Sequence, residues 1–482
     1  MSTPTRPSMN EVNPSSQQPE VNHPWVNHKP TYRAREVQIL ADWIRTGANG
    51  SVIGPSGTGK SDLLGFLCHR PEVLQGYLPS GSQPVTLLPM DLNTLPAPTL
   101  SALYRVILRA FDEHHHRFAP ESQKMISQTY EENSGQRDPF LSQTGVRKLL
   151  RHLQEQRHRV VFALDRFDAF STMLSPQMGD SLRGLRDGFK ETLSYITCMT
   201  HSPSYLPNPE VLGDLKRLLD QQVCILGPMS EQDTRQGIAR RVNSAETKPT
   251  TAEVATLVEL TGGYPSLVTQ VCRWWLTTKN KPSLEAWQEA LMQQINVRHR
   301  LEDIWFGLTQ EEQLVLTEMH GAFSMGESNQ EEVAERYRPT VAGLLEKGLL
   351  SHTDPGYRLF GTLFASHIAT IEEASRGRIS LEHASQTLYQ GAEIIQDLTA
   401  KERSILQFLA EEPYVQHTYT DIIVAAWTDE ERYHGVTNDS LFQVIRTLRR
   451  KIEPTPSKPV YVVNWRGKPE GGYQFFPEGR PR

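Results

Sequence analysis

The sequence predicts an open α/β domain built on a parallel five-stranded sheet, followed by helical segments and a compact C-terminal unit. Three observations lead to this prediction. Apolar runs alternate with helix-like segments between residues 31 and 230, a glycine-rich turn joins the first run to a helix, and the strand signal then fades until a terminal hairpin. Hydrophobic residues make up 38% of the 482 residues and charged residues 22%, which supports packed cores and excludes a wholly disordered chain.

Composition narrows the function classes further. No run of about 18 apolar residues occurs, so we expect no membrane partner. The net charge of −6 excludes a protein that is basic all over, so any nucleic-acid surface must be local. The four cysteines lie among apolar neighbours without a CxxC pair, which indicates buried thiols in a cytoplasmic protein. Residues 1–30 are rich in Pro, Ser, Asn and Gln, and they predict a disordered arm.

The first domain is predicted over 31–230. It opens with a helix over 31–47, in which Val37, Leu40 and Ile44 form one apolar stripe. Continuous apolar runs of the kind that follow suit strands buried on both faces of a parallel sheet. The five strand candidates are residues 51–54, 85–91, 159–165, 193–199 and 223–227.

A glycine-rich loop follows the first strand candidate. Residues 54–61, Gly-Pro-Ser-Gly-Thr-Gly-Lys-Ser, match the phosphate-loop pattern G-x-x-x-x-G-K-[ST] in full, and a helix-like segment comes next. In this setting backbone N–H groups and the helix N-terminus surround the phosphates of a nucleotide. We expect Lys60 to reach the β- and γ-phosphates of ATP and Ser61 to hold Mg²⁺. The predicted nucleotide-binding residues of the loop are Gly54, Gly57, Thr58, Gly59, Lys60 and Ser61.

An acidic residue ends the third strand candidate. Asp165 closes the run Arg-Val-Val-Phe-Ala-Leu-Asp and is the predicted Mg²⁺-associated carboxylate. AAA+-like ATPases usually place a water-orienting Glu directly afterwards, but this sequence has Arg166. Asp168 is the nearest spare carboxylate, and either it replaces that Glu or it caps the next helix. Nucleotide binding is therefore better supported than hydrolysis, and a useful rate of turnover stays open.

Polar groups near the fourth strand have two interpretations each. Thr197, Thr200 and His201 stand where a γ-phosphate sensor would lie, and ordinary hydrogen bonding at a strand end is the alternative. Arg183 and Arg186 on the preceding helix would act as arginine fingers in a homo-oligomer, or they form a solvated helix face.

The chain up to about residue 300 resembles the STAND branch of AAA+-related P-loop ATPases. The resemblance rests on the loop, the Asp165 strand, the Leu-Gly-Pro-Met-Ser segment from Leu226 and the Thr-Gly-Gly-Tyr-Pro segment ending at Pro265. It implies a nucleotide-dependent switch, a helical lid over 231–303 and a contact between Pro265 and the nucleotide. Residues 304–369 resemble the winged-helix unit often packed behind such lids, with a structural role. We expect a helical linker over 370–397.

The C-terminal unit contains a helix with one apolar stripe. In residues 438–452, Leu441, Ile445, Leu448 and Ile452 recur at spacings of four, three and four, so they should face inward. The opposite face would present Gln443, Arg446 and Arg450, residue types that read base edges in a major groove. The predicted phosphate contacts are Arg449, Lys451, Lys458 and Arg466. An ordinary solvated helix face is the alternative.

The order of elements in 398–477 resembles an OmpR/PhoB-type winged helix-turn-helix. The resemblance rests on Leu-Thr-x-x-Glu from Leu398, Trp427, Arg-Thr-Leu-Arg-Arg-Lys-Ile-Glu-Pro from Arg446, and the terminal hairpin. It implies duplex DNA as a partner and a loop over 428–437 that can touch RNA polymerase. The wing turn of the family is stretched here over 466–473. Residues 478–482 would be a tail.

Together the sequence predicts an α/β P-loop NTPase domain with a helical lid, followed by two winged-helix domains. The function we expect is that of a cytoplasmic, ATP-binding STAND switch that binds DNA, most simply a transcriptional regulator. Two alternatives stay open. One is a DNA-loaded AAA+ ATPase resembling origin-recognition proteins, and the other is a defence-type STAND sensor that uses winged helices for protein contact.

Overall fold

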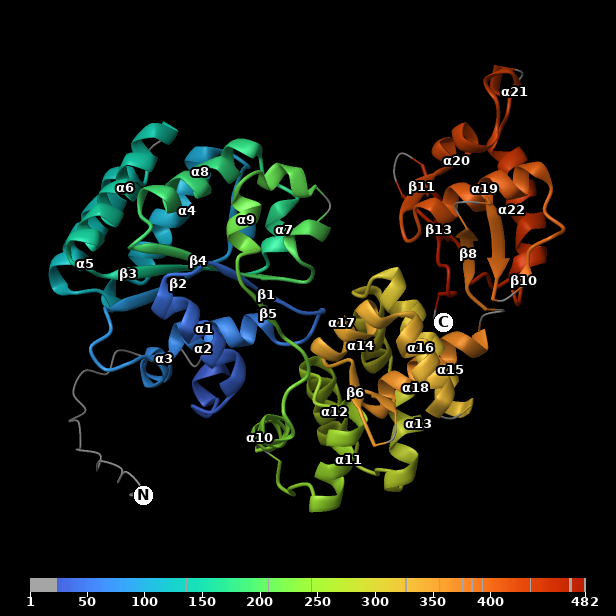
Figure 1. Cartoon of the computed structure of the whole chain (residues 1–482), viewed down its shortest axis with the longest axis horizontal. Helices are drawn as coiled ribbons and strands as arrows, with labels where there is room; N and C mark the ends of the chain where they lie inside the picture. The colour runs from blue at the N-terminus through green and yellow to red at the C-terminus, as the bar shows by residue number, and fades with distance from the viewer. Residues whose placement is uncertain are drawn as a thin grey trace. The chain divides into compact units, whose positions relative to one another are not determined.

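A computed structural model describes residues 24–480, apart from 136, 207, 244, 326, 355, 375–376, 383–384, 392, 434 and 468–469 (Figure 1). The chain divides into two units. The first unit holds the described residues up to Gly54 together with Gly59–Leu226, and the second unit holds Pro55–Thr58 and the described residues from Gly227 onward. Within the described part of the chain, no helix is long and apolar enough to cross a membrane.

The first unit is built on a five-stranded parallel sheet, as the apolar runs predict. The strand order is β2-β3-β4-β1-β5, so β2 is an edge strand and β1, which leads into the phosphate loop, lies between two neighbours. The strands are β1 Gly50–Ile53, β2 Val85–Met90, β3 Arg159–Leu164, β4 Leu193–Met199 and β5 Val223–Ile225. Every residue of β1 and of β4 is buried, which explains why these segments read as continuous apolar runs.

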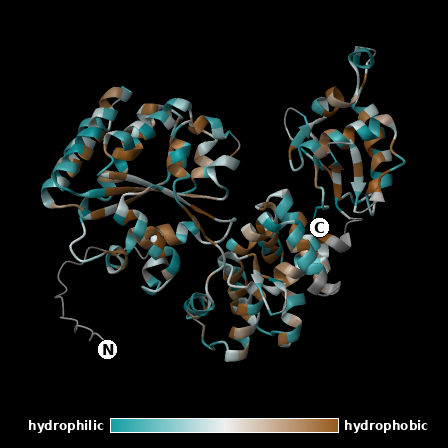
Figure 2. Ribbon diagram, viewed as in Figure 1, coloured by the Kyte–Doolittle hydropathy of each residue, from teal (hydrophilic) through white to brown (hydrophobic). Residues whose placement is uncertain are grey.

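Helices cover the sheet of the first unit (Figure 1). Leu88, Phe162 and Tyr195 are fully buried in one core with apolar side chains of the covering helices, and the strands are among the most hydrophobic segments of Figure 2. The helices are α1 Ala34–Thr46, α2 Lys60–His69, α3 Pro71–Tyr77, α4 Leu100–Glu113, α5 Pro120–Asn133, α6 Pro139–Glu155, α7 Phe167–Ser171, α8 Pro176–Gly188 and α9 Leu215–Leu219, with short 3-10 turns η1 Pro24–Asn27, η2 Leu92–Thr94, η3 His115–Arg117, η4 Pro203–Tyr205 and η5 Pro209–Leu212.

Part of the predicted disordered arm is ordered. Residues 1–23 lie outside the described residues, but Trp25 packs on α2, and its Nε1 donates to Asp62 Oδ1 at 3.2 Å. A Cβ at Gly65 would lie 2.5 Å from the Trp25 ring, so only a glycine lets the indole approach the helix this closely. The prediction of disorder over 1–30 is therefore wrong from residue 24 onward. The composition of this segment could not show that Trp25 packs against α2.

Helices dominate the second unit up to residue 374, as predicted. The Leu350–His352 and Tyr357–Leu359 strands form one antiparallel hairpin among them. The elements are α10 Glu231–Arg241, α11 Thr251–Thr261, α12 Pro265–Thr277, η6 Leu284–Ala286, α13 Trp287–Met292, α14 Ile295–Phe306, α15 Gln310–Met325, α16 Glu327–Arg336, α17 Arg338–Glu346, β6 Leu350–His352, β7 Tyr357–Leu359 and α18 Thr362–Ala374.

The predicted helical linker over 370–397 is wrong beyond Ala374. Strands β8 Ile379–Glu382, β9 Thr387–Gln390 and β10 Glu393–Ile394 form a three-stranded antiparallel sheet there. Ile379 and Leu388 are buried in the core of the C-terminal domain, so this sheet belongs to that domain. The strands escaped prediction because their conformation depends on residues outside each segment. Each strand is short, and its pairing with the next strand, rather than its own pattern, decides the conformation.

The C-terminal winged-helix domain, residues 377–480, follows the predicted order of helices and hairpin. Leu441, Ile445, Leu448 and Ile452 are the buried residues of α22, which confirms the inward stripe. The elements after β10 are α19 Ala400–Glu411, β11 Gln416–Thr418, α20 Tyr419–Ala426, α21 Asp429–Tyr433, α22 Asn438–Ile452, β12 Val462–Trp465 and β13 Gly472–Phe475, with sheet order β11-β13-β12. The predicted tail is packed in part, because Glu478 is only 4% exposed and pairs with Arg378.

Candidate functional site

The phosphate loop turns sharply between β1 and α2. Gly57 and Gly59 have φ values of +82° and +89°, a left-handed conformation that glycine adopts at low cost. Gly59 is the N-cap of α2, so Lys60 begins the helix, and its Nζ donates to Gly54 O at 2.5 Å. Burial lowers the pKa of Lys60, while Cys198, Asp168 and Asp165 act in the opposite direction. The ammonium group thus lies at the base of the loop, where the motif predicts it.

The tip of the loop, Pro55–Thr58, belongs to the second unit. There Tyr264 Oη donates to Ser56 O at 2.6 Å, and Ser266 N donates to Gly57 O at 3.1 Å. Pro265, between these two residues, is buried and begins α12. Tyr264 and Ser266, the residues on either side of Pro265, therefore hold this segment against the loop tip. The sequence predicted a site role for Pro265 but not for Tyr264, which precedes it in the motif, or for Ser266, which directly follows the motif.

Asp165 lies just beyond β3. Its Oδ1 accepts from Arg166 N at 2.9 Å, and its own N–H bonds Met90 O at 3.2 Å. Ser61 lies in the first turn of α2 and is exposed. A hydroxyl and a carboxylate are oxygen donors of the kind that Mg²⁺ takes from proteins, so this donor set fits the metal that the motif implies.

Arg166 occupies the position after Asp165 with a left-handed backbone. Its φ is +51° and its ψ is +43°, and it is the N-cap of α7. The side chain is exposed, and the carbonyl accepts from Asn93 Nδ2 at 3.2 Å. This left-handed conformation is uncommon for residues other than glycine and asparagine. The position after Asp165 therefore differs from an ordinary helix start in its backbone conformation as well as in its residue type.

Asp168 bonds to the segment after β4. Its Oδ2 accepts from Thr200 N at 3.1 Å and from Thr200 Oγ1 at 2.6 Å. Arg166 holds the N-cap position, and Asp168 lies in the first turn of α7, where its Oδ1 accepts from Ala169 N at 3.1 Å. The same carboxylate thus bonds an N-terminal N–H of α7 and joins this helix to Thr200. Lys60 lies within the electrostatic reach of this carboxylate. The structure therefore brings Lys60, Asp165, Asp168 and Thr200 into one neighbourhood.

Thr197, Arg183 and Arg186 form contacts within the first unit. Thr197 is fully buried, and its Oγ1 lies 2.8 Å from Ser51 Oγ on the adjacent strand. His201 is half-buried beyond Thr200. Arg186 donates to Asn49 Oδ1 at 3.2 Å and to Gly47 O at 3.0 Å, and Arg183 pairs with Asp187 on its own helix. These contacts favour internal and helix-surface roles over arginine fingers.

A second candidate site covers the outer face of α22. Gln443, Arg446 and Arg450 are all exposed there, opposite the buried stripe. A cavity of about 420 Å³ opens between this helix and the hairpin. It is lined by Phe442, Ile445, Arg446, Arg449, Arg450, Pro456, Ser457 and Tyr473. Lys458 and Arg466, on the segments that follow α22, are exposed as well.

Two of the predicted phosphate contacts are engaged inside the domain. Arg449 Nε donates to Val462 O at 2.9 Å, and its guanidinium lies 5.3 Å from the Tyr473 ring centre. Lys451 Nζ donates to Glu402 Oε2 at 2.6 Å. The first side chain joins α22 to the hairpin, and the second joins it to α19.

A residue that the sequence did not single out holds the end of α22. Glu453 is fully buried, and its carboxylate accepts from three successive backbone N–H groups, those of Val460, Tyr461 and Val462, at 2.6 to 3.0 Å. This carboxylate orients the start of the hairpin relative to the helix. The signal was the run Ile-Glu-Pro at the helix end, where an acid is unfavourable unless N–H donors surround it.

The parallel sheet and the glycine loop define a P-loop NTPase, and the C-terminal domain is a winged helix. Comparison with known protein families identifies the two parts of the chain more closely. The model of the family described as Novel STAND NTPase 1 matches residues 30–385, well over half of the chain, so the chain belongs to this family. The model described as Transcriptional regulatory protein, C terminal matches residues 393–475. No curated protein sequence matches the chain.

Several solved structures align with the chain over most of their length. The ORC2 protein of Aeropyrum pernix is 13% identical, with 71% of this chain and 94% of that chain covered and a TM-score of 0.38. The Walker-type ATPase of Pyrococcus abyssi is 14% identical, with 70% and 95% covered and a TM-score of 0.42. Cdc6p from Pyrobaculum aerophilum is 15% identical, with 74% and 96% covered and a TM-score of 0.34.

Proposed function

We propose that this protein is a transcriptional regulator in which ATP, bound with Mg²⁺ at the phosphate loop, controls the binding of duplex DNA by the C-terminal winged helix. One observation carries the proposal. A complete phosphate loop, set between β1 and α2, occurs in the same chain as a winged helix whose outer α22 face presents Gln443, Arg446 and Arg450. The proposed location is the cytoplasm.

The nucleotide contacts follow from the loop geometry. Backbone N–H groups of Gly57, Thr58 and Gly59 would face the phosphates, and Lys60 would exchange its bond to Gly54 O for phosphate oxygens. Ser61 and Asp165 would hold Mg²⁺, which supplies positive charge to the phosphate oxygens. Pro265, next to the loop tip, would contact the nucleotide. Because Asp168 already accepts two bonds from Thr200, we propose slow hydrolysis at most.

We assign DNA contacts only to the predicted residues whose side chains are exposed. Gln443, Arg446 and Arg450 would read base edges in the major groove. Lys458 and Arg466 would contact phosphates. Arg449 and Lys451 were predicted to contact phosphates too, and their internal bonds lead us to narrow that proposal to the two exposed cations. Residues 304–369 would form a second, winged-helix-like unit with a packing role.

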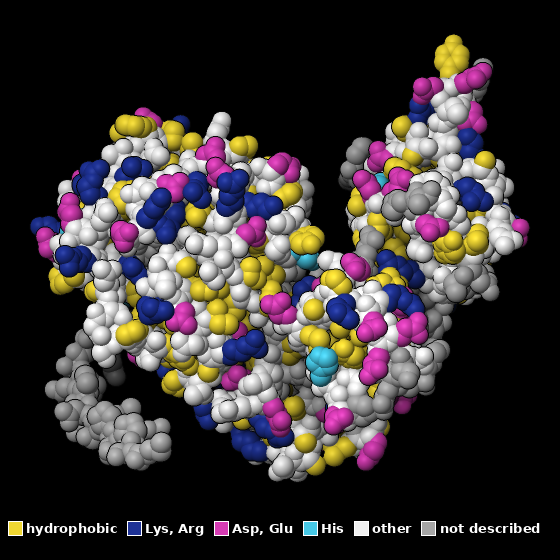
Figure 3. Space-filling model, viewed as in Figure 1, with side chains coloured by type: hydrophobic (Ala, Val, Ile, Leu, Met, Phe, Trp, Pro, Cys, Tyr) yellow, Lys and Arg dark blue, Asp and Glu magenta, His cyan; other side chains and the backbone are white. Residues whose placement is uncertain are grey.

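RNA polymerase is the proposed protein partner. The segment 428–437 includes α21, on which Asp429 and Glu430 are exposed and Tyr433 is 88% exposed. Figure 3 shows acidic and hydrophobic side chains gathered over this helix, an arrangement suited to protein contact rather than to DNA. We propose in addition that the switch operates in a homo-oligomer, as nucleotide switches of this architecture often do.

The full chain tests the proposal directly. DNA selected from a random duplex pool by the wild-type protein, with ATP and without it, should yield one enriched sequence that Arg446→Ala no longer selects. Lys60→Ala should bind the same sequence with an affinity that ATP does not change. Strong DNA-stimulated ATP turnover would instead favour a DNA-loaded ATPase. Failure to retain any duplex at low salt would favour a sensor that uses its winged helices for protein contact.

A further inference from the structure

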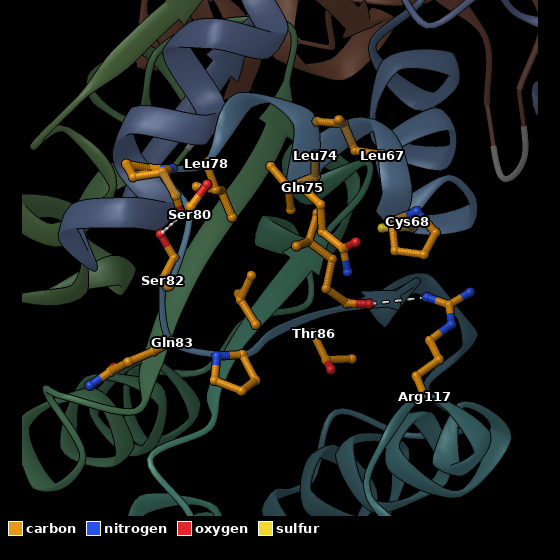
Figure 4. Close-up of a pocket in the computed structure, with 16 residues that line it drawn as sticks. Leu67, Cys68, Leu74, Gln75, Leu78, Ser80, Ser82, Gln83, Thr86 and Arg117 are labelled. Carbon is orange, nitrogen blue, oxygen red and sulfur yellow. Dashed lines mark hydrogen bonds between the residues drawn. The ribbon is translucent and has the colours of Figure 1, made fainter. Parts of the chain in front are cut away.

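A cavity of about 480 Å³ lies at the β2 edge of the sheet, within the first unit (Figure 4). It is enclosed by the C-terminal end of α2, by α3, by the loop that leads into β2 and by Arg117. Lys60 begins the same helix α2 whose last turn contributes Leu67 and Cys68, so with a rise of about 1.5 Å per residue the cavity and the phosphate loop lie roughly one helix length apart.

The walls of this cavity are mainly apolar. Leu67, Leu74 and Leu78 line it together with Pro71 and Pro84. Cys68 faces it as a neutral group, because burial raises the pKa of its thiol to about 12. The polar groups near the rim, on Gln75 and on the serines of the loop, are uncharged. The lining is therefore of the kind that holds the hydrocarbon part of a ligand.

Arg117 is the only cation that lines the cavity. Its NH1 donates to Leu87 O at 3.2 Å, on the free edge of β2, as the dashed line in Figure 4 shows. Among the described residues that line the cavity there is no carboxylate, and burial lowers the pKa of the Arg117 guanidinium. His114, in the adjoining turn, is uncharged at neutral pH. Burial is the main cause that lowers the pKa of His114 to about 4, and the charge of Arg117 adds to it. A half-buried guanidinium surrounded by neutral groups favours an anion from solution.

We propose that this cavity binds a small organic monoanion, with its carboxylate paired to Arg117 and its apolar body lying against Leu67, Leu74 and Leu78. The Arg117 fork can take a carboxylate through the N–H groups that NH1 does not spend on Leu87. A single cation among apolar walls matches one negative charge, whereas a phosphate dianion needs further cations or N–H donors. The site is separate from the phosphate loop, so neither ATP nor DNA is needed to occupy it.

Calorimetry on the full chain without nucleotide tests this site, with hexanoate as the probe and its neutral counterpart hexanamide beside it. We expect hexanoate to bind saturably and at least about tenfold more tightly than hexanamide, since a charge-assisted bond replaces a neutral one. Arg117→Gln should remove that preference, because glutamine carries no charge to pair with the carboxylate. Arg109→Gln is the matched control, as Arg109 lies on the preceding helix and pairs with Glu113.

A second variant tests the cavity independently of the charge. Gln75 is exposed at the rim, so Gln75→Trp should fold normally and weaken both probes by obstructing the entrance. Equal affinity of the wild-type protein for hexanoate and hexanamide would overturn the proposal, and so would unchanged hexanoate binding in both Arg117→Gln and Gln75→Trp. Tighter binding of inorganic phosphate than of hexanoate, lost in Arg117→Gln, would overturn the assignment to a carboxylate.

Discussion

Lys60 is the side-chain cation of the phosphate loop, and its Nζ is held by Gly54 O. We expect Lys60→Ala to weaken ATP binding at least tenfold, about 1.4 kcal/mol, because a charge on the β- and γ-phosphates is lost while the backbone N–H groups remain. Calorimetry measures the affinity, with Lys190→Ala as the control at an exposed lysine. Unchanged binding in Lys60→Ala would contradict the assignment of the loop.

Asp168 and Arg166 determine the expected rate of hydrolysis. We expect turnover on the order of one ATP per minute or less, far below the typical enzyme median of about 10 per second. If Asp168 replaces the water-orienting Glu, Asp168→Asn should abolish what remains while ATP still binds, because the carboxylate charge beside Lys60 is lost. Asp187→Asn, on the surface of α8, should leave the rate unchanged.

A glutamate directly after Asp165 should not by itself raise the rate of hydrolysis. Arg166 has a left-handed backbone. This backbone determines where the side chain at position 166 points, and a glutamate there would point the same way as the arginine, which is exposed. We therefore expect Arg166→Glu to leave turnover within a few-fold of wild type. A rate of several ATP per second, in either the wild-type protein or Arg166→Glu, would show that the site has been misjudged.

At the scale of elements, α22 carries side chains of two kinds. Arg446→Ala should cost about 1–3 kcal/mol on the selected DNA and little on scrambled DNA, because a contact to a base edge is lost. Lys458→Ala should weaken both DNAs alike and lower the salt slope by about one ion. Arg449→Ala should weaken both and also lower the melting temperature, since its guanidinium joins α22 to Val462. Titrations of each variant at two salt concentrations separate the three outcomes.

The contact between α19 and α22 predicts a dependence of stability on pH. Glu402 is 1% exposed, and its Oε2 accepts from Lys451 Nζ and from Thr399 N at 2.6 and 2.7 Å. Burial alone would raise the pKa of Glu402, but the bonds from Lys451, Thr447 and Thr399 outweigh burial and hold the pKa below its usual value. The carboxylate therefore stabilises the fold above the unfolded-state pKa of about 4.3, and this contribution is lost as pH falls through the lower folded-state value.

Glu402→Gln isolates that contribution. We expect the variant to lose on the order of 1 kcal/mol of unfolding free energy at pH 7 and progressively less below about pH 4. Urea titrations at several pH values measure the difference. A loss that stays constant down to pH 3 would mean that packing, rather than the carboxylate charge, is responsible.

At the scale of the whole molecule, binding of ATP and of DNA must be linked in both directions if one controls the other. Whatever factor ATP applies to the affinity for DNA, saturating DNA must apply to the affinity for ATP, and typical couplings are about 5–150-fold. We expect the two measured factors to agree in the wild-type chain, and the effect of ATP on DNA binding to require at least about tenfold more ATP in Lys60→Ala. Two independent affinities that do not respond to each other would remove the switch from the proposal.

The sequence predicted the features whose signal is local. The strands β1 to β5 are nearly all apolar, the loop from Gly54 to Ser61 is a contiguous motif, and the stripe of α22 repeats at helical spacing, so each could be read within one short segment. The β8–β10 sheet was missed because Ile379 and Leu388 owe their burial to helices far along the chain. For the same reason the sequence could not show that Arg449 would bond the carbonyl of Val462 instead of facing outward.

The indole of Trp25, lying on Gly65 and bonded to Asp62, places a natural fluorophore on the helix that carries Lys60 at its first position. Its emission depends on the hydrogen bond at Nε1 and on the adjacent carboxylate, so a displacement of α2 changes the light that the indole emits. The chain contains eight tryptophans, and the difference spectrum between wild type and Trp25→Phe isolates this one. Occupancy of the phosphate loop, or of the cavity at the opposite end of α2, can therefore be followed optically with no label attached.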